Sequence, residues 1–307
     1  MKIFSIKDFP LPFETAITIG AFDGIHIGHQ ALFRETLEAS QEFNLTPLVV
    51  TFDPHPRKVL QPQLSFKLLT TFEEKISLIE KEGFDKMVIL PFTHSLSELS
   101  PDLFVEKYLV DSLKARLVVV GFNFRFGKNR MGDGELLKKL GEKYNFQVKV
   151  VPPVEINGKK VSSSYIRDLI SKGDVEIAAL FLGRPYFLTG KVIKGKGRGR
   201  ALGFPTANLL VPQEKLIPAR GVYAVWAYLS NQRYKGALNI GFNPTFEEKE
   251  LSIEVHLLNF NSSEDLYEKY LRIEFIKYIR PEKKFSSIDE LRKQIKEDCQ
   301  LIEKILA

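Results

Sequence analysis

The chain has 307 residues, which at roughly 150 residues per domain predicts two domains, each with its own hydrophobic core. Its composition, 44% hydrophobic and 27% charged, is typical of globular proteins and excludes a disordered or collagen-like chain. The sequence has no apolar stretch near the ~18 residues of a membrane span and no signal-peptide region, so we expect a cytoplasmic protein. A single cysteine, Cys299, excludes an intrachain disulfide and a cysteine-rich metal site.

The positive charge lies in the second half of the chain. Residues 1–182 hold 23 basic and 23 acidic side chains, whereas residues 183–307 hold 21 and 15, which accounts for the net charge of +6. The sharpest excess is a run of cations and glycines between Lys191 and Arg200. Such a segment favours a phosphate ligand or a nucleic acid, and a solvated basic loop is the alternative.

In the first half, short apolar runs alternate with amphipathic stretches. We expect strands at residues 16–19, 48–52, 87–90, 117–120 and 148–151, and helices at 29–43, 72–81, 101–112 and 135–144. This alternation predicts an α/β fold with a doubly wound, mostly parallel sheet. In such sheets ligands bind beyond the carboxyl ends of the strands, where the loop at residues 21–27 would lie.

A helical stretch follows Ser162-Ser163-Ser164 and runs to about Leu182, with an interruption at Gly173-Asp174. Because Gly183-Arg184-Pro185 ends this pattern, we expect one domain at residues 1–184 and a second at 185–307.

From Tyr186 onward the pattern changes to alternation with a period of two. We expect strands at residues 187–193, 207–211, 222–228, 234–240, 253–258 and 271–278. With no helix between them, these strands predict an antiparallel six-stranded β-barrel. A C-terminal helix is expected from about Ser287, where Ser287 and Glu290 would form a capping box.

The segment Gly20–His29 reads Gly-Ala-Phe-Asp-Gly-Ile-His-Ile-Gly-His and directly follows the first expected strand. Glycines let the backbone approach a triphosphate, and the start of a helix supplies N–H donors. His26 and His29, three residues apart, can both face the phosphates. The segment therefore favours nucleotidyl transfer, with a chance pair of histidines in a tight turn as the alternative.

Three further segments carry candidate ligands. Phe52-Asp53-Pro54-His55 follows the second strand, so His55 would line the same crevice, although alone it is a rigid turn. Residues 121–128 include Asn123 and Arg125 among aromatic rings and suit a planar ring with a phosphate, or else a core beside a basic turn. Residues 162–167 place hydroxyls and Arg167 at a helix start, an anion site or simply a helix cap.

The second half has its own candidate site. Gly190–Gly197 nearly spells a Walker A loop, but Gly197 replaces the magnesium-binding hydroxyl and strands follow, so a P-loop NTPase is excluded. Thr206 and Asn208 point the same way on a strand and offer oxygen ligands to Mg²⁺. Glu254, a lone acid in a largely apolar strand, is a candidate general base, and an outward-facing strand glutamate is the alternative.

Together these segments resemble the bacterial bifunctional riboflavin kinase/FAD synthetase family over nearly the whole chain, and the first half resembles the HxGH nucleotidyltransferase superfamily. The resemblance implies an enzyme that phosphorylates riboflavin to FMN and then adenylylates FMN to FAD. It implies Mg²⁺ as cofactor, ATP as co-substrate, and riboflavin, FMN and FAD as substrates or products. It also implies a monomer or weak homo-oligomer with no nucleic-acid or membrane partner.

By this resemblance, the first domain contains an adenylyltransferase site. Its ATP ligands would be Gly20, Phe22, Asp23, Gly24, His26, Gly28, His29, Ser162, Ser163, Ser164 and Arg167, with His26 and His29 catalytic. Its FMN ligands would be Phe52, Pro54, His55, Asn123 and Arg125. Ser164 stands where the family usually has Thr, and Tyr165 where Arg is common. We expect activity to survive both departures.

The same resemblance places a riboflavin kinase site in the second domain, with Glu254 as the catalytic base. Its ATP and Mg²⁺ ligands would be Gly195, Lys196, Gly197, Arg200, Gly203, Pro205, Thr206 and Asn208, of which Thr206 and Asn208 would bind the metal. Arg280 and Phe285 match positions near the flavin, and Asn259 stands where the family often has Asp.

Two other functions are weighed against this interpretation. One is a nucleotidyltransferase with another acceptor, such as a phosphopantetheine or nicotinamide mononucleotide. The other is a nucleic-acid module that uses the basic loop and the barrel, which the modest net charge disfavours.

Overall fold

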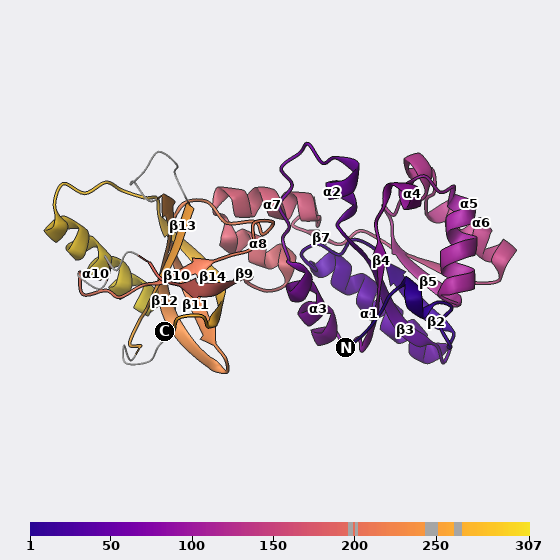
Figure 1. Ribbon diagram of the computed structural model, residues 1–307, viewed down its shortest axis with the longest axis horizontal. Coiled ribbons are helices and arrows are strands. Elements are labelled where there is room, and N and C mark those ends of the chain that lie inside the picture. The colour runs from indigo at the N-terminus through magenta and orange to yellow at the C-terminus, as the bar shows by residue number, and fades with distance from the viewer. Residues whose placement is uncertain (196–198, 200–201, 243–250, 261–265) are drawn as a thin grey trace. The chain divides into compact units, whose positions relative to one another are not determined.

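The computed structural model describes residues 1–195, 199, 202–242, 251–260 and 266–307 (Figure 1). Lys196, Gly197 and Arg200, which were predicted among the ATP and Mg²⁺ ligands, lie outside the described residues. The chain divides into two compact units, Met1–Ser162 and Ser163–Ala307, and each is described by itself.

The first unit is built on a six-stranded parallel sheet with the order β1-β4-β3-β2-β5-β6. Its strands are β1 (Lys2–Phe4), β2 (Thr15–Ile19), β3 (Thr46–Asp53), β4 (Lys86–Pro91), β5 (Ala115–Gly121) and β6 (Gln147–Val151). The sequence predicted all but β1, which is too short to show a period. The strand order reverses between β2 and β5, so the loop after β2 lies at the switch point where such sheets bind ligands.

Helices connect these strands. They are α1 (Ile27–Glu42), α2 (Pro56–Leu60), α3 (Phe72–Lys81), α4 (His94–Ser97), α5 (Pro101–Phe104) and α6 (Gly134–Tyr144), with short 3₁₀ turns η1 (Ile6–Asp8) and η3 (Lys128–Arg130). The helix expected at 101–112 is instead α5 followed by a π-helical stretch, η2 (Val105–Ser112). A two-stranded hairpin of β7 (Glu155–Ile156) and β8 (Lys159–Lys160) follows β6.

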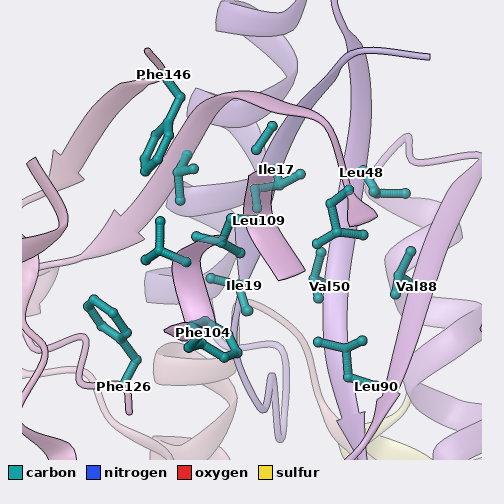
Figure 2. Packing of buried hydrophobic residues seen from close by; sticks show 14 of the residues in the cluster. Ile17, Ile19, Leu48, Val50, Val88, Leu90, Phe104, Leu109, Phe126 and Phe146 are labelled. Atoms are coloured by element: carbon teal, nitrogen blue, oxygen red, sulfur yellow. The ribbon is translucent and has the colours of Figure 1, made fainter. Parts of the chain in front are cut away.

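The core of the first unit forms against the central strands. Alternate residues of β2 and β3, such as Ile17, Ile19 and Val50, pack against Phe104 and Leu109 from α5 and η2 (Figure 2). Because successive strand residues point to opposite faces, this packing fixes the register of each strand and therefore where it ends.

The second unit contains a closed antiparallel barrel with the order β10-β13-β12-β11-β14-β9. Its elements are α7 (Ser163–Lys172), α8 (Val175–Leu182), β9 (Tyr186–Ile193), β10 (Ala207–Leu210), β11 (Gly221–Leu229), β12 (Gln232–Phe242), β13 (Leu251–Leu257), β14 (Tyr270–Arg280) and α10 (Ile288–Ile305). The predicted fold class, a parallel α/β sheet followed by a six-stranded barrel and a helix, is confirmed.

The helix pair α7 and α8 belongs to the second compact unit, where α8 contacts β9 and β14. The sequence had placed both helices in the first domain. The division at residues 184 and 185 therefore stays a prediction about which residues serve which activity.

The expected capping box at the start of α10 forms only in part. The Ser287 hydroxyl accepts a hydrogen bond from the Glu290 N–H at 3.1 Å, as predicted. The Glu290 carboxylate, however, accepts from the N–H and hydroxyl of Ser286 rather than from the Ser287 backbone. Ser286 offers the Glu290 carboxylate two donors, whereas the Ser287 backbone would offer one.

Candidate active sites

The loop between β2 and α1 is compact and ends in two stacked imidazoles. His26 caps α1, because its Nδ1 accepts a hydrogen bond from the His29 N–H at 3.2 Å. The two rings lie with centroids 3.6 Å apart and planes 14° apart. Since Nδ1 of His26 is an acceptor, the ring proton of neutral His26 lies on Nε2, which can donate to a phosphate oxygen.

The glycines of this loop leave room for its rings and its turn. A Cβ on Gly28 would lie 3.2 Å from the His26 ring. Gly24 has φ of +89°, a left-handed conformation that favours glycine, and a Cβ there would lie 2.7 Å from Leu69. The Gly-rich sequence is thus required by the packing of the loop as well as by any ligand.

Asp23 was predicted as an ATP ligand, and in the structure its carboxylate accepts hydrogen bonds from other residues of the protein. Its side chain is buried and accepts hydrogen bonds from the backbone N–H groups of Leu69 and Thr70, at 3.1 and 3.0 Å, and from the Thr70 hydroxyl. The Gly24 N–H donates to the same hydroxyl at 3.1 Å. These contacts fasten the loop to the segment that leads into α3.

The predicted FMN ligands lie at the carboxyl ends of β3 and β5, the two strands that flank β2 in the sheet. On β3, Phe52 packs edge-on against Phe92, and Pro54 and His55 follow the strand. His55 caps α2 through its Nδ1, and its ring lies 4.8 Å from that of Phe66. After β5, Asn123 and Arg125 are both exposed. The topology therefore places Phe52 near the carboxyl end of β3, and the other four beyond the carboxyl ends of β3 and β5, the two strands that flank β2.

The predicted ligands Ser162, Ser163, Ser164 and Arg167 span the boundary between the two units. Ser162 ends the first unit, and the other three lie in the first turns of α7. Their assignment to the nucleotide site stays a prediction.

The sequence analysis missed Lys75, a lysine on α3 that is only 6% exposed. Its Nζ donates to the carbonyl oxygen of Ala21 at 2.7 Å and to the Thr51 hydroxyl at 3.3 Å. Burial lowers the pKa of Lys75, against the opposing influence of Asp23 and Asp53. The available signal was the placement of Lys75 in the helical stripe that also carries Leu78 and Ile79, where a core residue is expected.

The second site lies on the outer face of the barrel. In the register of neighbouring strands, Asn208 on β10 pairs with Glu254 on β13, which pairs with Asn239 on β12. Ile253 and Val255 are buried, so the alternation of the strand directs Glu254 outward. Glu254 therefore faces outward, as the alternative interpretation expected, and the same orientation is compatible with a role as general base.

Hydroxyl groups hold the Glu254 carboxylate. Ser252 donates to Oε1 at 2.8 Å and Thr206 donates to Oε2 at 3.3 Å. A Cβ on Gly199 would lie 3.0 Å from the Thr206 hydroxyl, and one on Gly195 would overlap the Asn208 side-chain amide. The described glycines of the basic loop therefore lie directly against the predicted metal ligands.

The donor set of this site fits Mg²⁺. Thr206, Asn208 and Glu254 offer a hydroxyl, an amide and a carboxylate oxygen. In the described part of the chain no three histidine, cysteine or acidic side chains come together as a metal cluster. Mg²⁺ commonly uses one or two protein ligands and completes its shell with phosphate oxygens and water, which suits binding together with ATP.

Arg280, a predicted flavin contact, forms a two-pronged ion pair with Asp298 on α10. Its Nε lies 3.1 Å from Oδ1 and its Nη2 lies 2.7 Å from Oδ2. Gln294 donates to the same carboxylate, and the Phe285 ring centroid lies 5.9 Å from the guanidinium. This pair holds α10 on the barrel beside the row that contains Glu254, since Arg280 pairs with Val222, which pairs with Asn239.

Comparison with known proteins finds a family for each part of the chain. A family model described as FAD synthetase matches residues 10–165, and one described as riboflavin kinase matches residues 182–306. The bifunctional riboflavin kinase/FMN adenylyltransferase of Bacillus subtilis (strain 168) is 39% identical, covering 94% of this chain and 91% of its own. The chain belongs to the bifunctional riboflavin kinase/FMN adenylyltransferase family.

Other relatives also match this chain over nearly its full length. The family member from Escherichia coli (strain K12) is 34% identical and covers 92% of this chain and 90% of its own. A crystal structure described as a macrolide-efflux protein from Streptococcus pneumoniae is 33% identical, covers 98% of both chains and has a TM-score of 0.90. Among the described residues, no helix is long and apolar enough to cross a membrane. The predicted resemblance and domain order are confirmed.

Proposed function

We propose that the chain makes FAD in two consecutive steps. The second unit transfers the γ-phosphoryl group of ATP to the 5′-hydroxyl of riboflavin, giving FMN and ADP. The first unit transfers the adenylyl group of a second ATP to FMN, giving FAD and pyrophosphate. The observation that carries the proposal is that two separate sites, a stacked histidine pair and an oxygen-rich row around Glu254, lie in the segments matched by the two family models.

In the kinase step, Glu254 is the general base. Its carboxylate accepts the proton of the ribityl hydroxyl as that oxygen attacks the γ-phosphorus. Ser252 and Thr206 orient the carboxylate by donating one hydrogen bond to each oxygen. A magnesium ion, held by Thr206 and Asn208 together with ATP, would neutralise phosphate charge. A positioned base raises the reaction rate about a hundredfold or more, and the positioning of ATP supplies most of the remaining rate enhancement.

In the adenylyl step, a phosphate oxygen of FMN attacks the α-phosphorus of ATP and pyrophosphate leaves without a covalent enzyme intermediate. The imidazoles of His26 and His29 stabilise the negative charge that develops on the phosphates. The start of α1 adds backbone N–H donors and the positive end of the helix dipole. Phe52, Pro54, His55, Asn123 and Arg125 would hold FMN at the neighbouring strand ends.

The direct test is to incubate the protein with riboflavin, ATP and Mg²⁺ and to follow the three flavins by chromatography. Transient FMN followed by FAD is the expected result. FMN without FAD would mean that the first unit uses another acceptor, such as a phosphopantetheine or nicotinamide mononucleotide. The absence of any flavin product would contradict the proposed function.

The predicted location and assembly belong to the same proposal. We infer a cytoplasmic enzyme that is a monomer or a weak homo-oligomer and binds neither nucleic acid nor membrane. Light scattering coupled to size-exclusion chromatography measures the assembly, and a mass well above 35.1 kDa at low concentration would contradict it.

A further inference from the structure

A buried lysine lies against the backbone of the nucleotide loop. Lys75 extends from α3 to the carbonyl oxygen of Ala21, the second residue of the Gly20–His29 loop, at 2.7 Å. The Thr51 hydroxyl, on β3, accepts from the same ammonium at 3.3 Å and lies 3.4 Å from the Ala21 oxygen. A helix and a strand therefore converge on one peptide group of the loop.

Burial of this ammonium is costly. Both of its hydrogen-bond acceptors are neutral, and in the described part of the chain it forms no ion pair. An ammonium taken out of water without a paired carboxylate loses much of its solvation free energy, and burial accordingly lowers its pKa. A methionine would fill a similar volume without this cost, so packing alone does not explain a lysine here.

The peptide group that Lys75 contacts carries a backbone donor. Across a planar trans peptide the C=O and N–H bonds point in opposite directions, so the Phe22 N–H is directed away from Lys75. Phe22 has φ of +46°, and among the described residues no group accepts a hydrogen bond from its N–H. A backbone N–H that is aimed by a charged side chain and left without a protein acceptor is suited to an anionic ligand.

We propose that Lys75 is a positioning residue for adenylyl transfer, which holds the Ala21 carbonyl and thereby aims the Phe22 N–H at a phosphate of ATP. This proposal rests on the proposed function of the first unit. Residues 69 and 70, which precede α3, also contact the loop. They bind the Asp23 carboxylate, and Thr70 accepts a hydrogen bond from the Gly24 N–H, so these contacts fix Asp23 and Gly24. Of these contacts from residues 69–75, the one made by Lys75 lies nearest the start of the loop.

The test compares Lys75→Met with Lys81→Met, which removes an exposed lysine from the end of the same helix. Both activities are measured in each protein: riboflavin to FMN, which serves as an internal control, and FMN to FAD. For Lys75→Met we expect kcat for FAD formation to fall about 10- to 100-fold, because a misdirected donor fails mainly in the transition state. KM for ATP should change less than about threefold.

Two further measurements separate positioning from stability. The thermal midpoint of Lys75→Met should equal or exceed that of the wild type, because the variant buries no charge. Thr51→Val keeps the lysine but removes one of its acceptors, and should give a smaller loss of kcat in the same direction. Lys81→Met should change neither activity.

Three results would overturn the proposal. The first is FAD formation by Lys75→Met within about threefold of the wild type. The second is a lowered thermal midpoint with parallel loss of both activities, which would make the lysine structural. The third is a wild-type protein that forms FMN but no FAD, which would remove the proposed function of the first unit together with this inference.

Discussion

At the scale of single residues, the two sites depend on side chains that their neighbours hold in place. Glu254 is fixed through two hydroxyl donors, and His26 is fixed by its cap contact with the His29 N–H. Such preorganisation keeps a base or a donor in place before substrate binds. The chemical steps should therefore be lost one at a time when these residues change.

Replacement of the kinase base should separate the two activities. We expect Glu254→Gln, which keeps the shape of the side chain and its contact with Ser252, to lower kcat for FMN formation about a hundredfold or more. Conversion of added FMN to FAD should be unchanged, because that step uses the other unit. Chromatography with riboflavin and then with FMN as substrate measures both. Equal loss of both steps in a folded variant would contradict the division of labour.

His29→Ala is the complementary variant, which should remove the adenylyl step and keep the kinase step. It removes one ring of the stacked pair and one candidate donor to the phosphates, so FMN should accumulate and FAD formation should fall by about two orders of magnitude. The same time course reports both products. Normal FAD output from this variant would exclude a role for His29.

At the scale of elements, α10 is the clearest example of a helix fastened to a site by one ion pair. Asp298 is nearly fully buried and Arg280 half-buried, so loss of the arginine leaves a buried carboxylate unpaired. We expect Arg280→Met to lower the free energy of unfolding by about 3 kcal/mol. Urea denaturation measures it, with Lys172→Met, which breaks the exposed pair with Asp168, as a control of much smaller effect.

The single cysteine reports on the same helix. Burial, with Asp298 and Glu303 nearby, raises the pKa of Cys299 to about 11, so its thiol is neutral near pH 8. A thiol reagent should modify it about a hundredfold more slowly in the native protein than in denaturant. Because the folded state disfavours the thiolate, this group makes the protein less stable as the pH rises from the unfolded pKa of about 8.5 towards 11. Rapid native labelling would show that α10 opens readily.

At the scale of the whole molecule, each unit has its own fold and its own candidate catalytic residues, His26 and His29 in the first and Glu254 in the second. FMN made by one molecule should therefore be usable by another. A mixture of Glu254→Gln and His29→Ala proteins is expected to convert riboflavin to FAD at a rate limited by free FMN. If each variant works with its own substrate yet the mixture forms no FAD, FMN would have to stay within one molecule.

The local patterns of the sequence were sufficient for the elements and for most of the candidate site. The period of two in residues 187–278 and the βα alternation before it each follow from burial of one face, so both the barrel and the parallel sheet were predictable. The His26 and Glu254 segments stood out because their residue types are rare in such places. The strand β1 and the π-helical stretch were not predictable, since neither has a distinct period.

Tertiary structure alone decided which side chains meet. Lys75 and Ala21 are separated by 54 residues, and Arg280 and Asp298 are joined across a strand and a helix. The roles of Asp23 as a tie between segments and of Arg280 as an anchor for α10 likewise depend on contacts between distant residues. The fold class, the family and the two chemistries could be inferred from the residues alone, because they depend on local periodicity and on motifs. Partners across the fold are decided by packing, which no local pattern encodes.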